Sequence, residues 1–132
     1  MYEIVEHSAD VKIRVFFKSL QELIVSVTSG YRFLLVENAT LSGELFVKRY
    51  KFNRESQFYK VVVNYLNELI LQFDLKHSIP ENCTMIVVND EIIVDVNFRE
   101  VRNASVLVNI PKAATYSSLD EKNDQLEITI DV

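Results

Sequence analysis

The residues of this chain that are best suited to chemistry lie near its two ends. Glu6-His7-Ser8-Ala9-Asp10, the EHSAD segment, separates two short apolar runs, and an alternating run from Leu126 to Ile130 is followed by Asp131 and Val132. If the last strand lies beside the first, Asp10, Asp131 and the α-carboxylate of Val132 would converge in one corner. Carboxylates about 4 Å apart repel by about 4 kcal/mol per pair at an effective dielectric of about 20. The corner therefore requires a cation or wide separation, and its hard oxygen atoms favour Ca²⁺ or Mg²⁺ over softer metals.

His7 and Asp10 permit two interpretations. Their spacing allows an imidazole and a carboxylate to form a proton-handling pair. Alternatively, Asp10 bonds backbone amides in a turn and His7 packs beneath it, which the residues alone favour. A hydrolase built on this pair is the weakest hypothesis, because the sequence offers no nucleophile or oxyanion donors to accompany it. The chain also lacks a GxSxG, CxxC or phosphate-binding glycine motif, so we do not expect a self-sufficient enzyme.

The composition indicates one globular unit. The chain has 132 residues, of which 48% are hydrophobic and 25% charged, with only two Gly and two Pro, so we expect one core and no linker. It shows neither a secretory signal nor an apolar run long enough for a membrane span, which favours a cytoplasmic protein without a membrane partner. The single cysteine, Cys83, lies in an apolar run, where a small buried hydrophobe is a better interpretation than a reactive thiol.

The charge distribution argues against direct contact with nucleic acid. The formal net charge is −5, and the only basic cluster, Lys48-Arg49-Tyr50-Lys51, would present side chains on both faces of a strand. An acidic protein can instead bind an enzyme whose surface is basic. We therefore expect a protein partner.

The hydrophobic periodicity predicts an α+β fold with two helices packed on a largely antiparallel sheet of six to seven strands. Ser19 and Glu22 form a capping box for the first helix, and Gly30 within it marks either close packing or an early end. The second helix begins after a cap at Asn53 or Ser56. Strands are predicted at residues 2–5, 11–17, 44–52, 84–88, 92–98 and 125–131, with a less regular run at 105–117.

Four stretches resemble the archease family, in the same order and at matching spacing. The EHSAD segment resembles the E-H-T-A-D signature, and residues 65–74, YLNELILQFD, resemble the family's second helix. Lys112-Ala113-Ala114-Thr115-Tyr116 resembles its K-A-x-T-Y strand, and Ile130-Asp131-Val132 its terminal V-D-I. The resemblance covers the whole chain and implies a single archease-like domain at residues 1–132.

The resemblance implies a divalent-metal site, chiefly for Ca²⁺, with Mg²⁺ and Mn²⁺ as alternatives. Its ligands would be Asp10, Asp131 and Val132, the last through a main-chain or terminal oxygen. His7, Lys112 and Tyr116 would then lie behind the ligands and orient them, or contact a partner.

The implied function is that of an accessory protein for the GTP-dependent RNA-splicing ligase of tRNA maturation, promoting guanylylation of the ligase and repeated turnover. The sequence departs from the family pattern at Ser117, where a histidine is usual, and at Val108, Ile110 and Pro111, where polarity is lost before Lys112. A second hypothesis is a metal-free binding or chaperone-like module in which the EHSAD segment is a structural turn.

Overall fold

The computed structural model describes residues 1–6 and 10–132, which form two helices and seven strands. The strands are β1 (Tyr2–Glu6), β2 (Asp10–Phe16), β3 (Leu45–Asn53), β4 (Ser78–Val88), β5 (Glu91–Glu100), β6 (Ala113–Asp120) and β7 (Gln125–Asp131). The helices are α1 (Leu20–Val36) and α2 (Phe58–Lys76), with short 3₁₀ turns at Ala104–Val106 and Glu121–Asn123.

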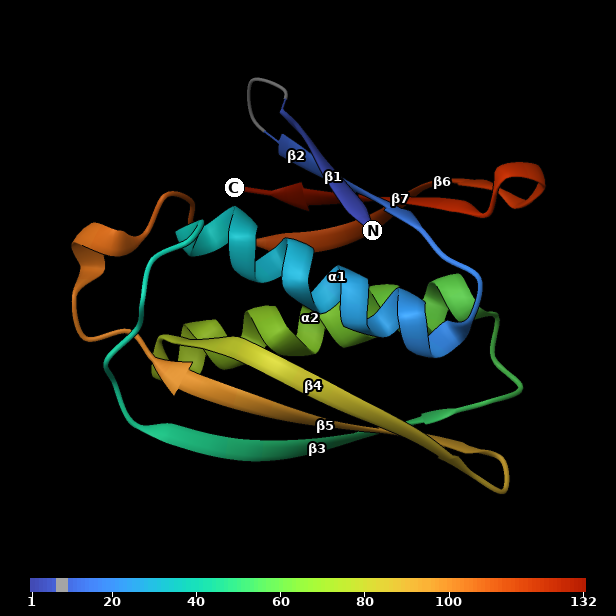
Figure 1. Cartoon of the computed structure of the whole chain (residues 1–132), viewed down its shortest axis with the longest axis horizontal. Helices are drawn as coiled ribbons and strands as arrows, with labels where there is room; N and C mark the ends of the chain where they lie inside the picture. Colours follow the sequence, from blue (N-terminus) through green and yellow to red (C-terminus); the bar gives the residue numbers. More distant parts are fainter. Residues whose placement is uncertain (7–9) are drawn as a thin grey trace.

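The strands form two antiparallel sheets with both helices between them (Figure 1). One sheet has the order β1-β2-β7-β6 and the other β3-β5-β4. Helix α1 contacts β1, β2 and β4, and α2 contacts β6, β4 and β3. The predicted α+β class is confirmed, while the strands divide into two sheets instead of continuing as one. Within the described ranges, no helix combines the length and apolarity needed to cross a bilayer.

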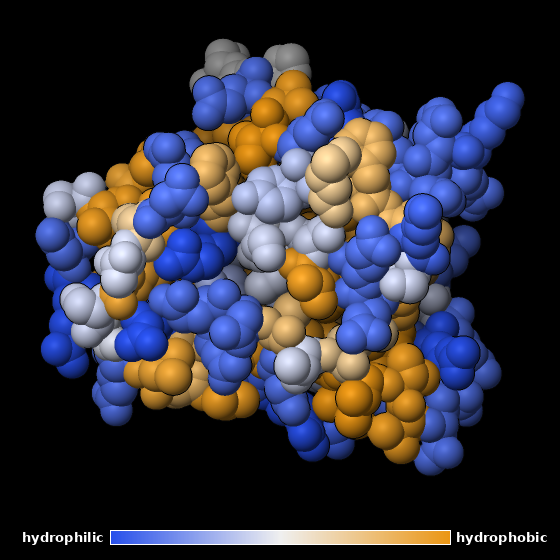
Figure 2. All heavy atoms as spheres, in the orientation of Figure 1, coloured by the Kyte–Doolittle hydropathy of each residue, from blue (hydrophilic) through white to orange (hydrophobic). Residues whose placement is uncertain are grey.

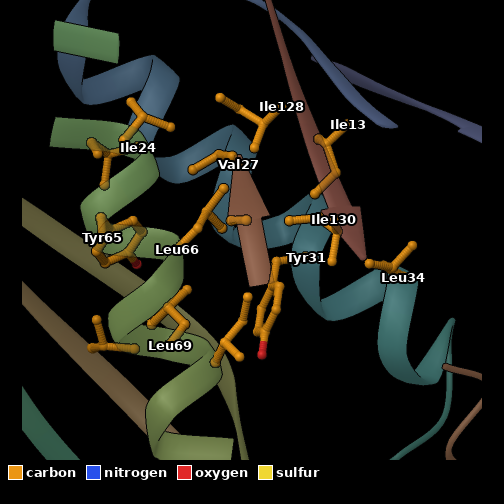
Figure 3. Close-up of a cluster of buried hydrophobic side chains, with 14 of the residues drawn as sticks. Ile13, Ile24, Val27, Tyr31, Leu34, Tyr65, Leu66, Leu69, Ile128 and Ile130 are labelled. Atoms are coloured by element: carbon orange, nitrogen blue, oxygen red, sulfur yellow. The ribbon is translucent and has the colours of Figure 1, made fainter. Parts of the chain in front are cut away.

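The core fills the two layers between the helices and the sheets. Ile13, Ile128 and Ile130 of the four-stranded sheet point toward the helices, where they meet Tyr31 of α1 and Leu66 of α2 (Figure 3). All five side chains are fully buried. Because each helix touches both sheets, its apolar surface is wider than the stripe of a helix lying on one sheet.

Gly30 lets α1 approach the four-stranded sheet closely. A Cβ atom at this position would lie 3.1 Å from both Ile13 Cγ2 and Tyr2 Cγ. Since α1 continues to Val36, close packing, and not an early helix end, explains the glycine.

The two predicted helix starts had different outcomes. The Ser19 hydroxyl accepts a hydrogen bond from the Glu22 backbone N–H at 3.1 Å, which confirms Ser19 as the cap of α1. The predicted cap of α2 at Asn53 or Ser56 is wrong, because α2 begins after Gln57 without a side-chain cap. Asn53 instead ends β3, where its side-chain oxygen accepts from the Glu55 N–H at 2.8 Å.

Candidate functional site

Asp10 and Asp131 lie directly opposite each other where β2 and β7 meet at one end of the four-stranded sheet. Their neighbours Val11 and Ile130 point into the core, and side chains alternate along a strand. Both carboxylates therefore lie on the outer face of the sheet, away from the helices. Opposed residues have Cβ atoms about 4.5–5.5 Å apart. The structure thus brings together the two acidic side chains that the sequence placed at a common corner.

This acid pair forms no ion pair with a described side chain, although Lys12 follows Asp10 on the same face of β2. None of the ion pairs in the described ranges includes Asp10 or Asp131. Arg14, further along β2, is held by Glu3 at 3.1 Å and Glu127 at 3.0 Å. In that same part of the chain, no three His, Cys, Asp or Glu side chains cluster as a metal site. A metal at the corner would therefore need main-chain oxygens, water or a partner for its remaining ligands.

Val132 and Lys112 adjoin the acid pair through the backbone. The Lys112 N–H donates to the Asp131 carbonyl at 2.8 Å, which ties the start of β6 to the end of β7. The Lys112 side chain is exposed, while the Val132 side chain is half-buried against the core. The structure thus places Lys112 and Val132 next to Asp131, and a ligand role for Val132 stays a prediction.

Tyr116 lies away from the corner. It pairs with Ile128, whose side chain faces the helices, and its ring centroid is 4.7 Å from that of Tyr59 at the start of α2. Its predicted contact with a partner remains a prediction, and such a contact would involve the helix side of β6. His7 lies outside the described residues.

Ser117 occupies a β-bulge in β6 that the sequence did not predict. The register passes from Tyr116 to Ser118, so residue 117 has no opposite residue on β7. The Ser117 hydroxyl forms a hydrogen bond with the Thr129 hydroxyl. Since Thr129 alternates with Asp131, Ser117 lies on the outer face that bears the acid pair, and the bulge places Ser118, opposite Glu127, on that face as well.

The outer face is further ordered by a cluster around Glu127. Partial burial alone would raise the pKa of Glu127, but hydrogen bonds from the Ser118 hydroxyl and the Arg14 guanidinium hold that pKa below its ordinary value. The cluster fixes β2, β7 and β6 relative to one another. The position of the acid pair is therefore supported by charged side chains as well as by the core.

A groove that was not predicted from the sequence opens on the helix side of the same sheet. Its volume is about 400 Å³, and its walls include Ile4, Phe33 and Val108, with the carboxylates of Glu6 and Glu37. Glu37 has a positive φ of 51° at the end of α1. Glu6 lies opposite Val11, the residue that follows Asp10 in β2, so the groove and the acid pair lie at the same end of the sheet. The apolar walls and two carboxylates suit a basic side chain of a partner.

Cys83 has little nucleophilic character. Its side chain packs against the core, and its Sγ lies 3.3 Å from the Thr28 hydroxyl. Burial raises the pKa of the Cys83 thiol, outweighing the hydrogen bonds to Thr28 and Tyr65. A raised pKa reduces the thiolate fraction, which supports a packing role.

Comparison with known proteins identifies the family. The model of the archease protein family (MTH1598/TM1083) matches residues 2–132. The chain belongs to the archease family. The solution structure of Methanobacterium thermoautotrophicum protein 1598 is similar to it with a TM-score of 0.72 and 15% identity, over 99% of this chain and 98% of that one. The crystal structure of an archease from Thermotoga maritima, described as a possible chaperone, gives a TM-score of 0.59 and 21% identity, over 99% and 95% of the two chains. No curated protein sequence matches the chain significantly.

At these identities, the two solved structures support the archease fold and leave the activity open. Their coverage shows that the likeness extends over both sheets and both helices of this chain. The family assignment rests on the match to residues 2–132, which includes Asp10, Lys112 and Asp131.

Proposed function

We propose that this archease-family protein is an accessory protein of the GTP-dependent RNA-splicing ligase, and that it promotes guanylylation and repeated turnover of that enzyme. The observation that carries the proposal is the opposed pair Asp10 and Asp131, with Lys112 bonded to the backbone of Asp131. These residues occupy the motifs by which the sequence resembles the family. Their exposed position at the end of the sheet leaves them accessible to another protein.

The acid pair is the proposed place for a divalent cation, chiefly Ca²⁺. Two carboxylates that form no ion pair with a described side chain provide hard oxygen ligands, and a main-chain oxygen of Val132 would add a third. When bound, Ca²⁺ would offset the repulsion between the carboxylates and present positive charge to phosphate oxygens. Two side-chain ligands leave most of the 6–8 oxygens that Ca²⁺ prefers to water or to the partner. Asp10 and Asp131 would thus hold the ion while leaving one side of it open.

The proposed partner is the ligase itself, without direct contact between this chain and RNA. The net charge of −5 opposes an approach to phosphates and favours a basic protein surface. The groove that contains Glu6 and Glu37 lies at the same end of the sheet as the acid pair. Because the groove lies on the helix side of the sheet and the acid pair on its outer face, a ligase that contacts both would have to enclose this end of the sheet.

RNA ligation by the ligase from the same source tests this function. The assay uses RNA substrate in excess and compares the wild type, Asp131→Ala and no added protein, with Glu44→Ala as a control for loss of an exposed carboxylate elsewhere. We expect the wild type and Glu44→Ala to increase turnover. The increase with Asp131→Ala should be smaller by a factor of at least about ten. Equal acceleration by Asp131→Ala would separate the function from the acid pair, and no acceleration by the wild type would refute the ligase role.

The second candidate function is a metal-free binding or chaperone-like module. It is favoured by the description of the Thermotoga maritima relative as a possible chaperone. It is also favoured because the described residues bring only two carboxylates, and no third His, Cys, Asp or Glu side chain, together at the corner. This alternative predicts that Asp10→Asn changes stability but leaves partner binding intact. Binding of Asp10→Asn and wild type to the ligase, each in EDTA and in CaCl₂, distinguishes the two functions, because only the accessory-metal function predicts a Ca²⁺-dependent difference.

A further inference from the structure

Hydrogen bonds hold one wall of the groove beside the end of α1. The segment before β6 forms this wall, where the Val108 N–H donates to the Leu35 carbonyl at 2.7 Å. The Asn109 side-chain amide donates to the Leu34 carbonyl at 2.8 Å. These two bonds satisfy carbonyl groups at the end of α1, which have no partner within the helix. The groove, of about 400 Å³, is therefore a fixed feature of the fold.

The two carboxylates of the groove lie at positions that do not favour an acidic residue. Glu6 lies on the helix side of β1, in phase with Ile4, because it is opposite Val11, which points into the core. Glu37 directly follows α1, where a negative charge opposes the helix dipole, and its φ of 51° lies in the region that favours glycine. Departures from local preference are expected at functional positions. These two acids therefore suggest a role beyond the stability of the fold.

The described residues leave the charges of Glu6 and Glu37 available to a partner. None of the described residues that line the groove is Lys, Arg or His, and the last turn of α1 contains no basic residue. Neither carboxylate belongs to an ion pair within the described ranges. The guanidinium of Arg32 reaches the end of α1, but it donates to the main-chain oxygens of Glu37 and Ala39. It also pairs with Glu81 at 3.5 Å.

We propose that the groove is a recognition site for an arginine side chain of a protein partner, with the guanidinium held by Glu6 and Glu37. Ile4, Phe33 and Val108 supply apolar walls for the aliphatic part of that side chain. Figure 2 shows apolar and hydrophilic side chains next to one another at the upper left, where Figure 1 places the end of α1 and the segment before β6.

The chemistry of the walls favours arginine over lysine or a metal ion. A guanidinium is planar and weakly hydrated, so its faces pack on apolar and aromatic side chains such as Phe33 while its edge donates to carboxylates. A lysine ammonium is a strongly hydrated point charge, which would lose water against the apolar walls. A divalent ion such as Ca²⁺ requires six to eight oxygen ligands, and the groove offers two carboxylates.

The arginine would come from the ligase, and this part of the inference rests on the proposed function. The groove and the acid pair lie at the same end of the four-stranded sheet, on opposite faces. An arginine bound between Glu6 and Glu37 would therefore anchor the ligase near Asp10 and Asp131 without occupying the proposed metal site.

Methyl NMR of the full chain tests the groove with short peptides as probes. The probes are the acetylated and amidated peptides GARAG, GAKAG and GAMAG, which differ only in the central residue. We expect GARAG to shift the Ile4 and Val108 methyl signals saturably, and to bind at least about threefold more tightly than GAKAG. GAMAG should produce no saturable shift, because it has no positive charge.

Substitution of each carboxylate shows whether the peptide lies between them. Glu6→Gln and Glu37→Gln should each weaken GARAG binding by about threefold, the effect of losing one exposed ion pair. The double variant should bind GARAG no better than GAMAG. Glu44→Gln is the matched control, because it removes an exposed carboxylate just before β3 and should leave GARAG binding unchanged. Circular dichroism checks that each variant folds.

Several results would overturn the arginine site. These are the absence of a saturable shift with GARAG, equal binding of GARAG and GAKAG or GAMAG, and unchanged GARAG binding in the double variant. Shifts of the Ile4 and Val108 signals on concentrating the chain without peptide would make a second copy the occupant, which also overturns it.

The ligation assay separates failure of the groove from failure of the proposed function. A wild type that binds GARAG but does not accelerate ligation would refute the ligase function and support the groove. A wild type that accelerates ligation but does not bind GARAG would overturn the groove alone. Where both hold, the double variant should bind the ligase at least about threefold more weakly than the wild type, and unchanged binding would overturn the assignment of the arginine to the ligase.

Discussion

Neutralising one member of the acid pair should have opposite effects on stability with and without a divalent cation. The change is Asp131→Asn, which keeps the size of the side chain and removes one of two opposed negative charges. In EDTA the variant should be more stable than the wild type, because like charges opposite each other on adjacent strands are destabilising. In CaCl₂ it should be less stable, because it has lost a ligand of the proposed site.

The magnitude follows from the position of the pair on the open face. Two unit charges 5–8 Å apart in a water-like dielectric repel by about 0.5–0.8 kcal/mol. For a chain of this length the unfolding entropy is about 0.28 kcal/mol/K, so the melting temperature in EDTA should rise by about 2–3 °C at low ionic strength. Since exposed charges are screened by salt, most of this gain should disappear in about 0.5 M NaCl.

The effect of Ca²⁺ should be larger than the relief of repulsion. A ligand at about 100 times its dissociation constant stabilises the folded state by about 2.7 kcal/mol, which corresponds to about 10 °C here. The wild type should gain this increment in CaCl₂, and Asp131→Asn should lose most of it. The order of the two melting temperatures therefore reverses between EDTA and CaCl₂.

Thermal unfolding followed by circular dichroism measures both effects. Asp10→Asn should behave like Asp131→Asn, and the double variant should gain no more in EDTA than either single variant, because each removes the same interaction. Glu44→Gln controls for the change in net charge. A melting temperature in EDTA that is lower for Asp131→Asn than for the wild type would refute the repulsion between the two carboxylates. An equal rise in melting temperature on adding CaCl₂ to wild type and variant would place any bound ion elsewhere.

Two further predictions concern the elements that hold the site in place. Tyr31→Phe should stabilise the protein by about 1 kcal/mol in urea unfolding, because the buried Tyr31 hydroxyl has no hydrogen-bond partner among the described residues. Tyr65→Phe should destabilise it by about 1 kcal/mol, because it removes a 2.7 Å hydrogen bond to Thr28, and equal effects of the two variants would contradict this reasoning. Ionised Glu127 stabilises the folded state, because its pKa is lower in the folded protein than in the unfolded chain. The free energy of unfolding should therefore fall as the pH drops from about 4.5 through the lowered pKa, where the carboxyl becomes protonated. The slope of unfolding free energy against pH should flatten in Arg14→Met, and an unchanged slope would count against the ion pair.

The alternation of side chains predicted the face on which each member of the acid pair lies, while their closeness was predicted by the resemblance to the archease family. In both terminal runs, every second residue is apolar, and Asp10 and Asp131 occupy the polar phase of the pattern. Once the last strand is placed beside the strand that begins at Asp10, as β7 lies beside β2, both carboxylates must lie on the outer face. The start of α1 could also be predicted from the sequence, because the Ser19 cap is a local interaction within four residues.

The features that the sequence did not reveal depend on contacts between distant segments. Alternation indicates which face of a strand is buried, but a strand of either sheet has the same pattern, so the division into two sheets could not be predicted. Asn53 has the residue type of a helix cap, yet it ends β3 and bonds the Glu55 N–H. The groove near Glu6 exists only because the end of α1 and the segment around Val108 meet β1 in space.

Ser117 shows how one structural feature limits the chemistry of the corner. Residue 117 lies in the bulge on the outer face, where its hydroxyl bonds Thr129, two residues before Asp131. At this position the sequence departs from the histidine of the archease pattern. A serine hydroxyl does not exchange protons near neutral pH as an imidazole does. The bulge therefore supplies no group for proton transfer, and Asp10, Asp131 and Lys112 are charged residues at this corner through which the proposed function can act.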